Sequence, residues 1–173
     1  MDFKNLANYK TVLVLLFVVV FNIAVFMLLG RLNDFVHGDL YNYGLVFNYG
    51  WADEVWHYNL LVWAFLISTT VLTVCAIIPH YFHSKGASGF SKLFGFLMPT
   101  LALVYQGLSI FYFSRMDSAV RTLLYNYGIP SSFDWSITYD PIVTATYALM
   151  VISMAALILP AVRSLEIVKI EVE

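Results

Sequence analysis

Four long apolar runs constrain the fold of this chain more than any other feature. The first extends from Thr11 to Gly30 without a charged residue. About 20 residues at ~1.5 Å each are enough to cross the ~30 Å hydrocarbon core of a bilayer. The other runs are residues 59–78, 93–113 and 141–159, and they also lack charged residues. We therefore predict an all-α integral membrane protein with four transmembrane helices.

The composition agrees with a membrane protein. Hydrophobic residues make up 61% of the 173 residues and charged residues only 12%, whereas a soluble domain has roughly 45–50% and about 25%. The net charge of −2 provides no basic field that would attract nucleic acid. The lipid bilayer is the expected partner, and nucleic acid is not.

A short motif near the middle of each half of the chain indicates an internal repeat. The motif Leu40-Tyr41-Asn42-Tyr43-Gly44 recurs 84 positions later as Leu124-Tyr125-Asn126-Tyr127-Gly128. The same offset carries Asn22 onto Gln106 and Trp51 onto Trp135. We predict one membrane domain, residues 1–173, made of two tandem helix–cap–helix repeats, residues 11–79 and 93–160, followed by a tail, residues 161–173. Because each repeat has two spans, both repeats have the same orientation in the membrane.

The repeated motif has two interpretations. It fits the end of a helix at the membrane interface, where tyrosines face the headgroups and Gly44 or Gly128 takes the left-handed conformation that follows a helix. It also fits a binding site, because two copies would bring two asparagines and four tyrosines together.

Aromatic residues are frequent between the spans of each repeat, in segments 45–58 and 129–140. We expect these segments to be interfacial loops that form an aromatic-rich cap, with Pro141 in the first turn of the last helix and prolines 79 and 160 ending theirs. The alternating tail, residues 165–173, is expected to be either an edge strand or disordered.

The basic residues predict the orientation. Six of the nine lie in the amino terminus, the central link and the carboxy tail, namely Lys4, Lys10, Lys85, Lys92, Arg163 and Lys169. The positive-inside rule then predicts a multi-pass protein of the cell membrane with both termini in the cytoplasm and both caps outside.

Asn22 and Gln106 are equivalent in the repeat and lie near the middle of their spans. An amide in hydrocarbon needs a hydrogen-bond partner, so both are expected to face inward. A bond between helices would contribute roughly 0.6–2 kcal/mol. A polar lining for a substrate or quinone, and a conducting path, are the alternatives.

The first cap holds a candidate metal set, His37, Asp53, Glu54 and His57. Imidazole and carboxylate groups bind zinc, iron and copper, and Glu54 and His57 have the i, i+3 spacing of di-iron bundles. The second repeat lacks these residues, so solvated polar side chains on an exposed cap are the other reading. The sequence assigns no cofactor.

These features predict a non-enzymatic structural or accessory subunit of a membrane complex, with a protein partner or further copies of itself in the membrane. Gly-x-Ser-x-Gly, Walker-type and His-Glu-x-x-His motifs are absent from the sequence. One alternative is a small redox or metal-dependent membrane enzyme. The other is a channel or carrier with its path between the repeats.

Overall fold

The fold is all-helical, as the sequence predicts. The computed structural model describes residues 3–36, 49–82, 89–126 and 135–169. Within these ranges it contains four long helices, α1 (Phe3–Asp34), α3 (Tyr49–Phe82), α4 (Gly89–Asn126) and α5 (Trp135–Lys169). Each contains a stretch long and apolar enough to cross a membrane, namely Tyr9–Asp34, Glu54–Ile78, Leu97–Thr122 and Ile137–Val162. The chain is therefore built as a multi-pass membrane protein.

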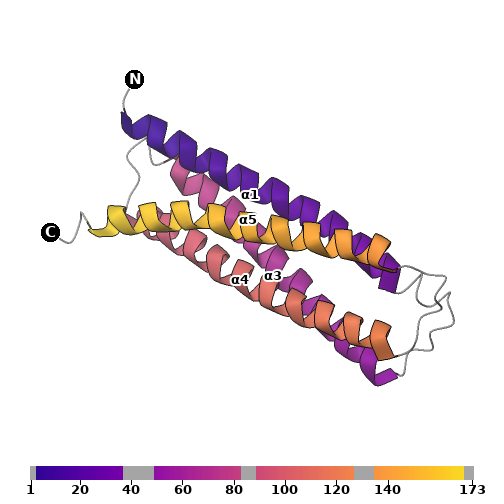
Figure 1. Ribbon diagram of the computed structural model, residues 1–173. Helices are drawn as coiled ribbons and strands as arrows, with labels where there is room; N and C mark the ends of the chain where they lie inside the picture. The colour runs from indigo at the N-terminus through magenta and orange to yellow at the C-terminus, as the bar shows by residue number, and fades with distance from the viewer. Residues whose placement is uncertain (1–2, 37–48, 83–88, 127–134, 170–173) are drawn as a thin grey trace.

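The four helices form an elongated bundle (Figure 1). α1 packs against α3 and α5, and α4 packs against the same two helices. α1 and α4 are therefore diagonal neighbours, as are α3 and α5. Both chain termini lie at one end of the bundle, which we name the terminal end. The opposite end, where α1 and α4 finish and α3 and α5 begin, is named the distal end.

The core of the bundle consists of two apolar clusters. The distal cluster includes Leu29, Leu66, Phe113 and Met150, and each is at most 1% exposed. Among the described side chains, the terminal cluster has five fully buried members, which are Leu15, Val18, Ala76, Ala102 and Leu157. Both clusters draw on all four helices, so the helices are joined by side-chain packing along the length of the bundle.

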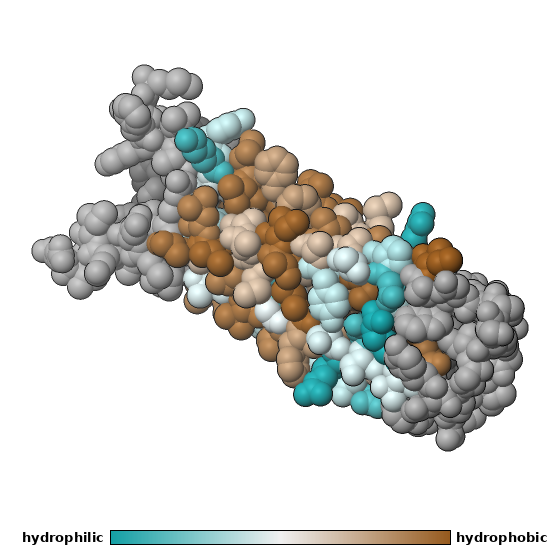
Figure 2. Space-filling view, in the orientation of Figure 1, coloured by the Kyte–Doolittle hydropathy of each residue, from teal (hydrophilic) through white to brown (hydrophobic). Residues whose placement is uncertain are grey.

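The outside of the bundle is apolar as well. Large hydrophobic side chains face outward on every helix, for example Met27 at 71% exposure, Val71 at 54%, Phe111 at 50% and Val151 at 53%. Figure 2 shows hydrophobic side chains around the middle of the molecule and hydrophilic ones gathered toward the distal end. A surface of this kind is stable against lipid chains, where apolar side chains lose nothing by exposure.

The buried positions recur at an interval of 84 residues. The buried positions of α1 and the turn that follows it correspond to buried positions of α4: Leu15, Val18, Asn22, Val25, Leu29, Leu32, Phe35 and Val36 to Pro99, Ala102, Gln106, Ser109, Phe113, Met116, Ala119 and Val120. The buried α3 positions Val55, Asn59, Val62, Leu66, Thr69, Thr73 and Ala76 correspond to the buried α5 positions Tyr139, Val143, Thr146, Met150, Ser153, Leu157 and Pro160. The two halves of the chain therefore present the same helix faces to the interior.

The predicted helix boundaries were wrong in several places. Residues 49–58 belong to α3 rather than to a loop, because Val55 continues the buried face of that helix with helical spacing. α5 begins at Trp135, six positions before Pro141, and runs past Pro160 to Lys169, so the tail up to that residue is helical rather than a strand or disordered. α3 likewise continues three residues beyond Pro79. Transmembrane helices tolerate proline because neighbouring groups satisfy the freed carbonyl.

Candidate functional site

A charged network at the distal end joins α4 to α5. Arg121 donates from Nε to Oδ1 of Asp117 over 3.0 Å and from Nη2 to Oδ1 of Asp140 over 2.7 Å. Tyr139 donates its hydroxyl to the same Asp117 oxygen over 2.9 Å. The side chains of Asp117, Arg121 and Asp140 are 15%, 33% and 39% exposed, so the network lies at the border between the core and the surroundings. One arginine thus compensates two carboxylates where α4 meets the start of α5.

Tyr139 anchors this network in the distal cluster. It is fully buried, and its ring centroid lies 5.5 Å from that of Phe35 in the turn that directly continues α1. The guanidinium carbon of Arg121 lies 5.5 Å from the centroid of the same ring. Contact between a cation and the face of a tyrosine ring contributes about 0.5–2 kcal/mol, depending on how far water is excluded. Tyr139 therefore connects α1, α4 and α5 through one side chain.

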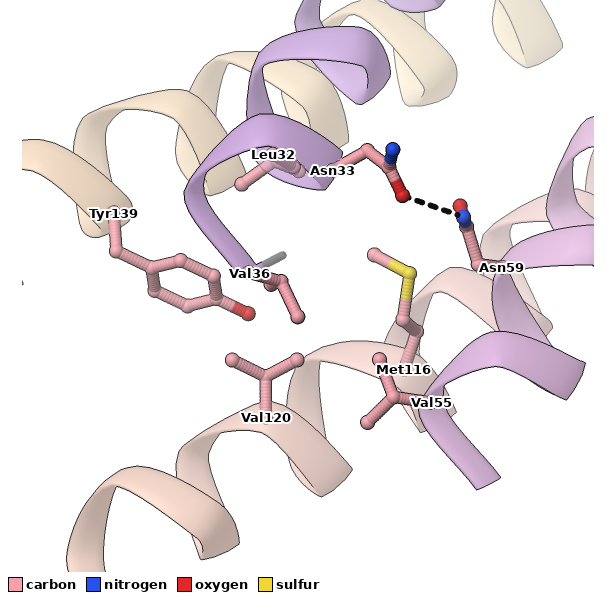
Figure 3. Close-up of a pocket in the computed structure, with 8 residues that line it drawn as sticks. All are labelled: Leu32, Asn33, Val36, Val55, Asn59, Met116, Val120 and Tyr139. Carbon is pink, nitrogen blue, oxygen red and sulfur yellow. Dashed lines mark hydrogen bonds between the residues drawn. The ribbon is translucent and has the colours of Figure 1, made fainter. Parts of the chain in front are cut away.

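A pocket lies beside Tyr139, between the four helices. Its atom-free space is ≈ 290 Å³, which includes space open to the surroundings. The lining residues are Leu32, Asn33, Val36, Val55, Asn59, Met116, Val120 and Tyr139. Figure 3 shows the apolar side chains on its floor and the Asn33–Asn59 pair on one side. The part of this space that a molecule can occupy is about the size of one water molecule, so the pocket offers no room for a larger ligand.

The two halves of the chain carry different chemistry at equivalent positions of this site. Asn59 donates from Nδ2 to Oδ1 of Asn33 over 3.3 Å, which joins α1 to α3. At the offset of 84, Asn33 corresponds to Asp117 and Val55 corresponds to Tyr139. Asn59 corresponds to Val143, so the second half has a carboxylate and an apolar side chain where the first half has its amide pair.

A polar layer crosses the bundle near its middle. Asn22 is fully buried on α1 and donates from Nδ2 to Oγ1 of Thr70 on α3 over 3.2 Å. Gln106 is fully buried on α4 and donates from Nε2 to the carbonyl oxygen of Met150 on α5 over 3.2 Å. The structure thus places both amides inside the bundle, each bonded to the other helix of its own half.

The repeated motif falls largely outside the described residues. Tyr41, Asn42, Tyr43, Gly44, Tyr127 and Gly128 lie in ranges that the structure does not describe. The backbones of Tyr125 and Asn126 belong to the last turn of α4, which ends at Asn126. The choice between a helix end and a binding site at this motif stays open.

The predicted metal set also lies only partly within the described residues. Glu54 and His57 are exposed on the first turns of α3, and the hydroxyl of Tyr58 donates to Oε1 of Glu54 over 3.2 Å. His37 lies outside the described residues, and nothing is described of the Asp53 side chain. Within the described part of the chain no three histidine, cysteine or acidic side chains gather closely enough to hold a metal ion. The four-residue metal site stays a prediction.

The sequence reasoning missed the charged network. Asp117 and Arg121 have the i, i+4 spacing of a helical ion pair, so half of the network was readable from the chain. The sequence predicts a loop at Tyr139 and Asp140, and a loop gives no reason to expect their contact with α4.

The chain matches no protein-family model, and no curated protein and no solved structure shows significant similarity to it.

Proposed function

We propose that this protein is a non-enzymatic structural or accessory subunit of a membrane complex. In this role it binds a protein partner, or further copies of itself, within the cell membrane. Both termini lie in the cytoplasm, and the distal end, with its aromatic-rich cap, faces outside. The orientation rests on the distribution of lysine and arginine along the chain.

The observation that carries this proposal is a closely packed interior combined with an apolar outer surface. Apolar clusters pack on both sides of the polar layer, and large apolar side chains cover the outside of all four helices. Interhelical bonds such as Asn22–Thr70 and Arg121–Asp140 hold neighbouring helices in fixed register. A rigid, packed body with an apolar perimeter is suited to forming lateral contacts in a bilayer.

The repeat architecture is part of the same proposal. The recurrence of buried positions at an interval of 84, together with the diagonal placement of α1 and α4, supports two tandem parallel repeats related by a pseudo-two-fold axis along the bundle. Such an arrangement arises when one helical hairpin is duplicated and its copies pack face to face. The difference between Asn33 and Asp117 then arose after the duplication.

Purification of the tagged full chain from its native membrane in mild detergent tests the function. Light scattering gives the mass of the protein component, and mass spectrometry identifies any partner. We expect a mass above that of one 19.7 kDa chain, from a second copy or a stoichiometric partner. A single chain with no recovered partner would contradict the proposal.

Tryptophan substitutions locate the contact face. Met27→Trp, Val71→Trp, Phe111→Trp and Val151→Trp each enlarge or reshape an outward side chain on a different helix, and lipid accommodates the change. A protein interface does not accommodate it, because its packing is close. We expect one of the four variants to lose the complex while the other three keep it.

The polar layer favours a second candidate, a channel or carrier with its path between the repeats. Asn22 and Gln106 place amide groups where the two halves of the bundle meet. Reconstitution in liposomes and measurement of ion or solute flux test this candidate. Flux that is lost in Gln106→Leu, with the bundle still folded, would favour the carrier over the accessory subunit.

A further inference from the structure

Three buried polar atoms of the middle layer have no hydrogen-bond partner within the described chain. They are Oδ1 of Asn22, Oε1 of Gln106 and Oγ of Ser153. All three residues are fully buried. An unpaired buried polar atom lowers the folding equilibrium constant by roughly tenfold or more, so three in one layer need an explanation.

The bonds already present fix the orientation of the Asn22 amide. Thr70 donates its hydroxyl hydrogen to the carbonyl oxygen of Leu66 over 2.8 Å. Oγ1 of Thr70 can therefore only accept, and the group it accepts from is the Nδ2 of Asn22. The amide oxygen of Asn22 is left as a free acceptor by this chain of bonds.

The same argument holds for Gln106. Its partner is the carbonyl oxygen of Met150, which has no hydrogen to donate. The amide must present its nitrogen to that carbonyl, so Oε1 is a second free acceptor. If the amide were flipped, Oε1 of Gln106 would face the carbonyl oxygen of Met150, and two acceptors repel each other.

Ser153 differs from several threonines of the spans. Thr69, Thr70, Thr73 and Thr146 each donate to the carbonyl oxygen four residues earlier, over 2.7–2.9 Å. Ser153 makes no such bond, although its helix offers the carbonyl of Leu149. Its hydroxyl is therefore free to bond a group outside its own helix.

The three residues lie at a similar depth in the bundle. Gln106 bonds to Met150, and Ser153 is one helical turn from Met150 on α5. The ring contact between Phe35 and Tyr139 sets the register of the antiparallel helices α1 and α5. Asn22 lies thirteen positions before Phe35, and Ile152, the neighbour of Ser153, lies thirteen positions after Tyr139. Asn22 and Ser153 are thus level with each other.

We propose that this layer is a binding site for ordered water inside the bundle. Water can donate to the amide oxygens of Asn22 and Gln106 and can accept from the hydroxyl of Ser153. Buried water typically makes about three such bonds to otherwise unpaired groups. The set draws on α1, α4 and α5, so the water joins the two halves of the chain at mid-membrane.

Water fits this layer better than a cation does. The ligands are neutral, and the described carboxylate nearest to Gln106 on α4 is Asp117, eleven residues away, or about 16 Å along the helix. A cation in such a layer would be buried without a counter-charge, which is far more costly than burying a neutral molecule. The adjoining apolar clusters hold no charge that would compensate it.

Magnetisation transfer from water tests the site directly. In the ¹⁵N-labelled full chain in nanodiscs, the side-chain amide protons of Asn22 and Gln106 are assigned through Asn22→Leu and Gln106→Leu. We expect water cross-peaks to both amides with the sign of long-lived, bound water. These protons lie beyond the reach of bulk water, so a cross-peak reports water bound inside the bundle. The absence of cross-peaks from both amides would overturn the proposal.

The stability of Ser153→Ala provides an independent readout. If Ser153 bonds to water, its removal should raise the unfolding equilibrium constant about 3- to 10-fold. If its hydroxyl has no partner, alanine should stabilise the protein, which would overturn the assignment. Ser68→Ala is the matched control, since Ser68 donates to the carbonyl of Ala64 on its own helix. A rise in stability with sodium, potassium or ammonium, but not with choline, would assign the layer to a cation and overturn the water site.

Discussion

Tyr139 and Asp117 meet across the interface between α5 and α4, with the tyrosine hydroxyl 2.9 Å from Oδ1 of the carboxylate. The same oxygen accepts from Arg121. One carboxylate oxygen therefore accepts from a neutral and a charged donor at the distal end. Each donor can be removed by a single substitution.

Tyr139→Phe should lower the free energy of unfolding by about 1–2 kcal/mol. The ring and its packing on Phe35 remain, but Asp117 loses one donor, and bonds to a charged acceptor are the stronger kind. Thermal unfolding in detergent measures the change. Tyr105→Phe is the control, because that tyrosine stacks on Phe65 without a hydrogen bond in the described chain, and its stability should stay the same.

Arg121→Gln should destabilise the protein by about 1–2 kcal/mol, since two partly buried carboxylates lose their counter-charge. Exposed ion pairs contribute about 0–1 kcal/mol and fully buried ones more, and Arg121 lies between these limits. Arg31→Gln is the control, because Arg31 is an exposed arginine on α1. This change should alter stability by less than about 0.5 kcal/mol. Equal effects of the two variants would mean that the network adds nothing to stability.

Adding Asp140→Asn to the Arg121 variant isolates one pair of the network. Their double-mutant cycle should give a coupling energy of about 0.5–1 kcal/mol, decreasing in 1 M salt. A coupling of zero at low salt would show that the 2.7 Å contact does not stabilise the fold.

Thr70→Val should lower stability by about 0.6–1.7 kcal/mol, which are the average and the largest value measured for hydrogen bonds between transmembrane helices. Valine keeps the branched shape but removes the acceptor of the Asn22 amide. Unfolding by a denaturing detergent provides the measurement. Thr122→Val, which removes only an exposed bond to the carbonyl of Ser118, should have the smaller effect.

Phe113→Ala should be among the most destabilising single changes, at about 3–5 kcal/mol. Phe113 is fully buried and packs edge-on against Tyr147 with ring centroids 4.7 Å apart. Phe111→Ala, two positions away on the exposed side of α4, should change stability by less than about 1 kcal/mol. Comparable losses for the two variants would argue that the interior of α4 has been placed on the wrong face.

Cysteine labelling tests the proposed orientation. In a Cys75→Ala background, Glu54→Cys marks the distal end and Lys10→Cys marks the terminal end, because both positions are exposed. A membrane-impermeant maleimide added to intact cells should label position 54 but not position 10. The reverse pattern would place the chain termini outside.

The helices were predictable because each depends on a local property of the chain. Uncharged runs such as 59–78 must be helical in lipid, where every backbone group needs a partner within its own segment. Helix ends were harder to predict, because proline signals that apply in water are weaker in this setting. Pro160 was expected to stop α5, yet the helix continues to Lys169.

The polar contacts were less predictable because they depend on how the helices meet. Inspection of the sequence placed Asn22 and Gln106 at equivalent positions, but it could not show that the first bonds to a hydroxyl and the second to a backbone carbonyl. The link from Arg121 to Asp140 spans 19 positions and two helices, and no local pattern encodes it.

The two apolar clusters on either side of the polar layer differ in the size of their side chains. The distal one contains bulky members such as Phe113 and Tyr139, whereas two of the five buried members of the terminal one are alanines. Because dispersion attraction grows with the number of atoms in contact, the terminal cluster, as far as its side chains are described, holds its helices less firmly than the distal cluster does. The helices should therefore separate first around the terminal cluster. A partner that binds there would deform the bundle more easily than one that binds at the distal cluster.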